Sequence, residues 1–104
     1  MALLGNPFVA NVNRQMSNEE LTQALRVDIA GELEAIIGYE AHIMSTNDTR
    51  VIKILTHIAD EERQHVGELQ QLLTMLNAKE ADYMEKGKQT VVQQQSQNFQ
   101  APIQ

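Results

Sequence analysis

Two residues near the middle of the chain have the types and the spacing of metal ligands. Glu62 and His65 lie three positions apart, so on a helix both side chains point to the same side. Apolar residues continue that side in alternating steps of four and three: Val51, Leu55, Ile58, Leu69, Leu72 and Leu76. Such a seam is typical of the face that a helix turns towards a partner helix. A carboxylate and an imidazole therefore occupy positions where Leu or Ile is expected.

An earlier segment shows the same pattern around a single acid. Its seam consists of Leu25, Ile29, Glu32, Ile36, Tyr39 and Ile43. A carboxylate among apolar residues is costly unless it is paired or binds a metal. Two such segments predict a cation between them, and carboxylate and imidazole donors together favour a first-row transition metal, iron or manganese, over Mg²⁺ or Ca²⁺.

Composition narrows the class of protein. The chain has 104 residues, 42% of them hydrophobic but only 4% aromatic, which favours one small all-α domain packed by aliphatic side chains. It has no cysteine, which excludes disulfides, iron–sulfur clusters and thiolate zinc sites. A net charge of −6 without a basic stripe argues against nucleic acid and favours cations. We expect no membrane partner and a cytoplasmic location, because neither a transmembrane run nor a signal peptide is evident.

Capping patterns divide the chain into two long helices and a shorter one. Ser17 and Glu20 form a capping box that predicts a helix over about 18–45. Asn47 or Asp48 caps a second helix over about 49–76. A third, short helix is expected over about 78–92, with Asn77 as its cap. The helical domain then covers residues 17–92, between an N-terminal arm (1–16) and a flexible Gln-rich tail (93–104).

The turn at residues 46–48 is so short that the two long helices must form an antiparallel hairpin. Glu32 lies about 14 residues before this turn, and Glu62 and His65 lie about 15 to 18 residues after it, so all three fall roughly 20 Å from the turn. The fold thus brings them to the same height. Gly31 and Gly38 have two interpretations: close packing against another helix, or weak helix positions without a role.

Both long helices also carry a second apolar stripe, which one hairpin cannot cover as well as the seam. The stripe consists of Ala30, Leu33, Ile37, Ala41 and Met44 on the first helix, and Ile52, Ala59, Val66 and Leu73 on the second. We therefore expect association with other copies of the chain.

One copy holds half of a known ligand set. In di-iron carboxylate bundles, two helices each supply a Glu and two others each supply Glu-x-x-His. Two copies related by a two-fold axis would supply Glu32, Glu62 and His65 twice each, which places the site at a homodimer interface. In this arrangement Glu62 bridges the metals, Glu32 and His65 are terminal ligands, and Tyr39 donates a hydrogen bond to a ligand.

Three acids and two histidines lie near this set without belonging to it. Asp28, one turn before Glu32, is placed to assist it, and Glu34 points elsewhere. His57 and Glu61 lie off the seam, and we expect them to be solvated, as we do His42.

The residues from Glu32 to Ala35 with Tyr39, followed by Asp60-Glu61-Glu62 and His65, resemble the encapsulated ferritins, a branch of the ferritin-like superfamily. The resemblance covers about residues 18–92. It implies a two-helix hairpin with a short third helix that builds a ferritin-like four-helix bundle and di-iron centre only on dimerisation. It also implies a ring-shaped decamer, and oxidation of ferrous iron for storage inside an encapsulin shell.

Carried over by position, the resemblance makes Glu32, Glu62 and His65 the ferroxidase ligands, Tyr39 a neighbour of the ligands, and Glu34 a secondary metal site on the path by which iron arrives. The family often has an acid where this chain has Gly31, and Trp where it has Gly38. The family's short shell-targeting peptide is not evident in residues 93–104. The alternatives are a non-catalytic helical oligomer stabilised by metal, and an interaction module whose buried polar residues set helix register without metal.

Overall fold

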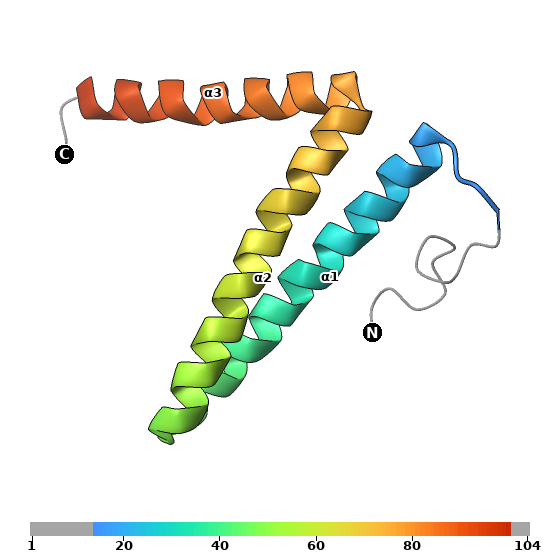
Figure 1. Ribbon diagram of the computed structural model, residues 1–104. Helices are drawn as coiled ribbons and strands as arrows, with labels where there is room; N and C mark the ends of the chain where they lie inside the picture. Colours follow the sequence, from blue (N-terminus) through green and yellow to red (C-terminus); the bar gives the residue numbers. More distant parts are fainter. Residues whose placement is uncertain (1–13, 101–104) are drawn as a thin grey trace.

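The computed structural model describes the backbone of residues 14–100 and the side chains up to residue 96. It consists of three helices: α1 (Asn18–Met44), α2 (Thr49–Leu76) and α3 (Ala78–Gln100). Most of the predicted N-terminal arm (residues 1–13) and the end of the predicted tail (residues 101–104) lie outside the described residues. The helices α1 and α2 run side by side in opposite directions, and α3 turns sharply away from them (Figure 1). The all-α hairpin predicted from the sequence is confirmed.

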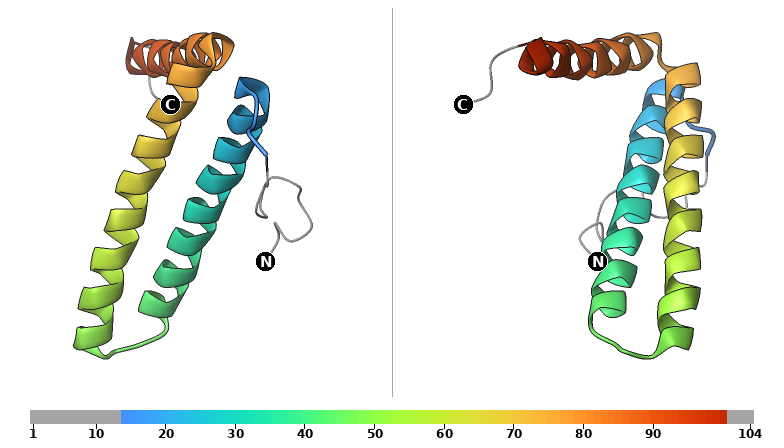
Figure 2. Two further views of the ribbon diagram at one scale, coloured as in Figure 1. Left: turned by 45° about the vertical axis from the view of Figure 1, so that its right-hand side comes forward. Right: turned by 90° about the vertical axis from the view of Figure 1, so that its left-hand side faces the viewer.

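The ends of the helices follow the predicted capping residues. The hydroxyl of Ser17 accepts from the backbone N–H of Glu20, and the Glu20 carboxylate accepts from the N–H of Ser17. Asp48, rather than Asn47, caps α2 and accepts from the N–H of Arg50 at 2.9 Å. Because each capping residue satisfies an N–H that has no partner inside its own helix, the starts of α1 and α2 are fixed locally. Two further views show the hairpin closed by the short turn between them (Figure 2).

The interior of the hairpin is narrow, and on α2 it includes positions of both the predicted seam and the neighbouring stripe. Of the side chains described, only Ala59, Leu73 and Thr22 are buried, at 1%, 3% and 3% exposure. Ala59 and Leu73 belong to the stripe assigned to association between copies, whereas Val51 and Leu72 of the seam are 39% and 47% exposed. Leu55, Ile58 and Leu69 of the seam are half-buried, so the most buried positions of α2 lie just beside the seam, in the second stripe.

The glycines of α1 do not lie at a close helix contact within this chain. A Cβ added at Gly31 or Gly38 would meet no atom within 4 Å. Within the described chain the space beside these residues is open, so close packing against another helix stays a prediction that only a helix of a second copy could fulfil.

Large apolar side chains remain exposed on the outer side of α1. Leu33, Ile37 and Met44 are 47%, 68% and 82% exposed. A contiguous apolar surface of this kind is typical of proteins that associate, so formation of a four-helix bundle on dimerisation stays a prediction that this surface favours. None of the helices in the described region is long and apolar enough to cross a membrane.

The third helix is longer than the sequence suggested. It continues to Gln100, so the backbone of residues 93–100, predicted as flexible, is helical. Gln has good helix propensity, and no proline interrupts the segment before Pro102. The side chains from Glu85 to Ser96 are all exposed, so this part of α3 packs against no other segment that the structure describes.

Candidate metal centre

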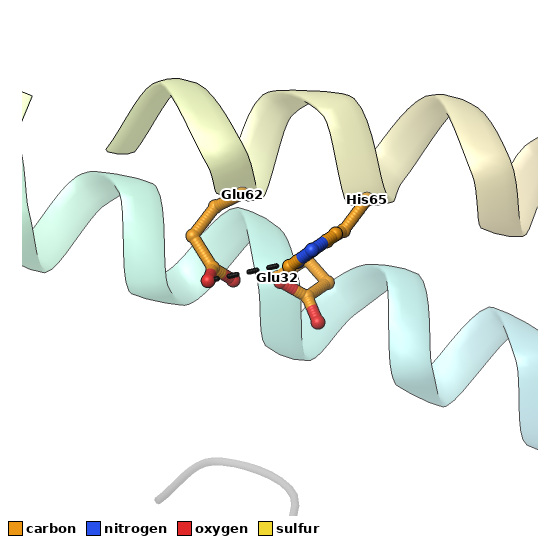
Figure 3. Close-up of side chains that lie close together, drawn as sticks. All are labelled: Glu32, Glu62 and His65. Carbon is orange, nitrogen blue, oxygen red and sulfur yellow. Dashed lines mark ion pairs between the residues drawn. The ribbon is translucent and has the colours of Figure 1, made fainter. Parts of the chain in front are cut away.

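Three of the predicted ligands meet between the two long helices. Glu32 comes from α1, Glu62 and His65 come from α2, and one ligand atom of each lies within 4.8 Å of the others. The Nδ1 atom of His65 is 3.6 Å from Oε2 of Glu32 and 3.7 Å from Oε1 of Glu62. Figure 3 shows the three side chains converging from facing helices. The antiparallel hairpin thus brings them to one height, as the equal distances from the turn predicted.

The cluster is partly shielded from solvent and incompletely hydrogen-bonded. The side chains of Glu62, Glu32 and His65 are 19%, 26% and 45% exposed. The Oε2 atom of Glu32 is buried and accepts no hydrogen bond from any of the described residues. Its separation of 3.6 Å from the imidazole nitrogen is too long for a good hydrogen bond. A buried carboxylate oxygen without a donor is costly, and a bound cation would compensate it.

Asp28 increases the negative charge around the cluster. Burial, and next the negative charge of Glu32, raise the pKa of its carboxyl above the ordinary value. These carboxylates repel one another when no cation is present, so the site attracts positive charge.

The other residues singled out from the sequence lie outside the cluster. Tyr39 is half-buried on α1 but, among the described residues, makes no hydrogen bond to Glu32, Glu62 or His65. Glu34 is exposed. The part of the chain that the structure covers contains no second group of three or more His, Asp or Glu side chains with converging ligand atoms.

His57 and Glu61 are solvated, as expected. They form an ion pair at 2.5 Å with side chains 70% and 53% exposed. The expected exposure of His42 is also confirmed.

One contact beside the site was not predicted. Arg63, next to Glu62, forms ion pairs with Glu40 of α1 and with Asp60 of its own helix. The pair with Glu40 joins residues 23 positions apart, and no local sequence pattern signals a contact over that separation. It links the two helices close to the level of the cluster.

A known structure places this arrangement in a family. The chain matches the crystal structure of the encapsulated ferritin domain from Pyrococcus furiosus with a TM-score of 0.74 and 37% identity, over 83% of this chain and 88% of that one. The chain belongs to the encapsulated ferritins. Residues 19–86 also match the model of the family described as ubiquinone biosynthesis protein COQ7, which is part of the ferritin-like superfamily too. The resemblance noted in the sequence is therefore confirmed.

Relatives of this encapsulated ferritin have names that refer to encapsulins. It is 40% identical over 76 residues to the encapsulin nanocompartment cargo protein EncC of Myxococcus xanthus, and 38% identical over 82 residues to a ferritin-like–encapsulin shell fusion protein of Pyrococcus furiosus. The matches cover 73% and 79% of this chain. They span only 58% of the cargo protein and 24% of the fusion protein.

Proposed function

We propose that this protein is a ferroxidase, which oxidises Fe(II) to Fe(III) at a di-iron centre shared between two copies of the chain. The observation that carries the proposal is the buried Oε2 of Glu32, which lacks a hydrogen bond and lies opposite Glu62 and His65. These residues are one half of the ligand set of a di-iron carboxylate bundle.

A single hairpin offers three ligand residues, which are too few to hold two iron ions. A second copy, related by a two-fold axis, would add the same three residues. His65 is 45% exposed, and Val51 and Leu72 extend an exposed apolar surface along the same seam on either side of it. This surface is where a second hairpin would cover the site and complete a four-helix bundle. The ring-shaped decamer implied by the family would then be built from such pairs.

The chemistry follows from the properties of the ligands. The iron is substrate: two Fe²⁺ ions each lose one electron to dioxygen, which takes up two protons and leaves as hydrogen peroxide, while two Fe³⁺ ions are formed. Carboxylates bind both oxidation states and adjust between terminal and bridging positions, while a nitrogen donor such as the imidazole of His65 favours iron over Mg²⁺. The protein's contribution is to hold two cations close together. Tyr39 keeps its proposed role as hydrogen-bond donor to a ligand, and Glu34 as an outer cation site.

The names of the relatives support a role as encapsulin cargo. We propose that the protein acts in iron storage and detoxification, inside an encapsulin nanocompartment in the cytoplasm. An open helical assembly has no cavity of its own for mineral, so a shell would hold the ferric product.

The proposal is tested by following the oxidation of ferrous iron in air through ferric absorbance and oxygen consumption. The variant Glu32→Ala/Glu62→Ala/His65→Ala should oxidise iron at the rate of buffer alone, whereas His57→Ala/Glu61→Ala, which removes the exposed pair on the same helix, should match the wild type. A wild-type rate in the first variant would rule out this site. If the wild type binds iron without oxidising it faster than buffer, the metal is structural and the protein is not an enzyme.

A further inference from the structure

The third helix is joined to the hairpin by very little protein. A single non-helical residue, Asn77, with φ −140° and ψ 103°, separates the end of α2 from the start of α3. Its side-chain oxygen accepts from the N–H of Glu80 at 3.1 Å, and its own N–H donates to the carbonyl of Leu73 at 3.1 Å. These bonds cap the two helices at the joint. They do not by themselves fix the direction of α3 relative to α2, because that direction depends on the two backbone dihedral angles of Asn77.

One side-chain contact ties α3 to the other helix of the hairpin. The guanidinium of Arg26 on α1 donates two hydrogen bonds to the carboxylate of Glu80, at 2.9 Å and 3.3 Å. A third bond, to the amide oxygen of Gln23 at 3.1 Å, holds the guanidinium in place. Such a two-point contact fixes orientation as well as distance. Elsewhere in the described chain the backbones of α1 and α3 do not touch, so this pair is their hydrogen-bonded link.

The space beside the joint is not filled by protein. A hollow of about 230 Å³ lies between the first turn of α1 and the joint, lined by Asn18, Glu19, Thr22, Leu76, Asn77 and Ala78. On this side of the joint, therefore, no packed protein supports α3, although Ala81 and Met84 in its first two turns are half-buried. The far part of the helix has no support either, since the side chains from Glu85 to Ser96 are exposed.

We propose that Arg26 and Glu80 form a latch that sets the direction in which α3 leaves the hairpin. With the latch closed, α3 stands away from α1 and α2 (Figures 1 and 2) and presents Tyr83, Val91 and Val92, which are 61%, 59% and 56% exposed. With the latch open, Asn77 acts as a hinge and these side chains lose a fixed orientation. The latch fixes the direction of α3 whether or not iron is bound.

The test measures the distance between the hairpin and α3. Because the chain has no cysteine, Gln70→Cys and Gln93→Cys introduce two unique sites for spin labels at exposed positions of α2 and α3. Doubly labelled chains are diluted with unlabelled chains, so that pulsed electron–electron resonance reports distances within one chain only. We expect a narrow distribution in the wild type and one that is broader by roughly two-fold or more in Arg26→Ala.

Three comparisons make the result decisive. The charge swap Arg26→Glu/Glu80→Arg should narrow the distribution again. The control Arg50→Ala removes an exposed Arg–Asp48 pair at the opposite end of the hairpin and should leave it unchanged. Salt at about 1 M, where the Debye length is about 3 Å, should broaden the wild type. The latch would be overturned if the distance distribution of Arg26→Ala equalled that of the wild type while circular dichroism showed the variant to be folded. It would also be overturned if the charge swap failed to narrow a broadened distribution.

Discussion

Two carboxylate–histidine pairs on α2 lie less than three turns apart and differ in almost every physical respect. His57 and Glu61 form a 2.5 Å ion pair with side chains 70% and 53% exposed. Glu62 and His65 are 3.7 Å apart, with side chains 19% and 45% exposed, and face Glu32 of the other helix. His57 and Glu61 bind each other and water, whereas Glu62 and His65 leave the buried Oε2 of Glu32 without a hydrogen-bond donor. Residue type alone therefore does not distinguish the two pairs, whereas unsatisfied burial does.

The largest expected difference between the pairs is in the rate of iron oxidation. Glu62→Ala should lower the rate by about 100-fold or more, because changes to groups that merely support metal ligands already cost about 10- to 100-fold. Glu61→Ala, one position away, should stay within about two-fold of the wild type. Stopped-flow measurement of ferric absorbance compares the two. Equal rates in the two variants would show that Glu62 has no role in iron oxidation that Glu61 lacks.

The next effect concerns ferrous affinity. His65→Ala removes the only nitrogen donor of the three proposed ligands and should weaken anaerobic Fe²⁺ binding by about 10-fold or more. His57→Ala should change it little, because its imidazole already pairs with Glu61 in solvent. Competition with a chromogenic iron chelator under nitrogen measures both. Stronger loss in His57→Ala would move the site to the outer face of α2.

A smaller effect of opposite sign is expected for stability without metal. Glu62→Leu replaces a largely buried carboxylate in an apolar seam and should stabilise the metal-free protein by about 1 kcal/mol. Glu61→Leu should change its stability by no more than about 0.5 kcal/mol. Urea unfolding in the presence of chelator, at one fixed chain concentration, gives the two values. A Glu62→Leu variant that is less stable than Glu61→Leu would mean that the carboxylate is satisfied without metal.

The smallest expected effect is on stability, and it tests the repulsion between the negative charges of Asp28 and Glu32. Burial and the charge of Glu32 raise the pKa of Asp28, so its charged form is disfavoured in the folded state. The resulting loss of stability is complete above the raised pKa and vanishes below the ordinary one. Asp28→Asn should therefore stabilise the metal-free protein at pH 7, but only by a few tenths of a kcal/mol, because solvent still reaches the side chain and screens its charge. It should add nothing at about pH 3.

The control for Asp28 is the same change made in a Glu32→Gln background, where the gain should shrink because one of its two causes is gone. Urea midpoints at both pH values provide the comparison. A gain that is equal at the two pH values would have to arise from something other than charge.

The sequence predicted most of the fold because the relevant signals are local. Ser17, Glu20 and Asp48 satisfy backbone N–H groups within their own turns, and the short turn leaves only an antiparallel hairpin. The meeting of Glu32 with Glu62 and His65 follows from their equal distances from that turn. Their separation of 30 residues or more is therefore no obstacle to predicting it.

The errors concern contacts that depend on the number of partners. The alternation around Glu62 identifies a half-buried face, but the two fully buried residues of α2, Ala59 and Leu73, each lie one position after a seam residue. A periodic pattern cannot say which of two apolar stripes faces the first partner and which faces the next. The extension of α3 to Gln100 was missed because a polar, Gln-rich composition is shared by exposed helices and flexible tails.

Anaerobic titration of the metal-free protein with Fe²⁺, with the mass of the assembly measured at each step, tests the shared centre most directly. We predict saturation at one iron per chain, with bound iron found only in assemblies that contain an even number of chains. The variant Glu32→Ala should not bind Fe²⁺, and its chains should not pair when Fe²⁺ is added. Saturated binding by single chains would contradict a centre shared between two copies, and no binding at all would show that the half-buried acids serve helix pairing alone.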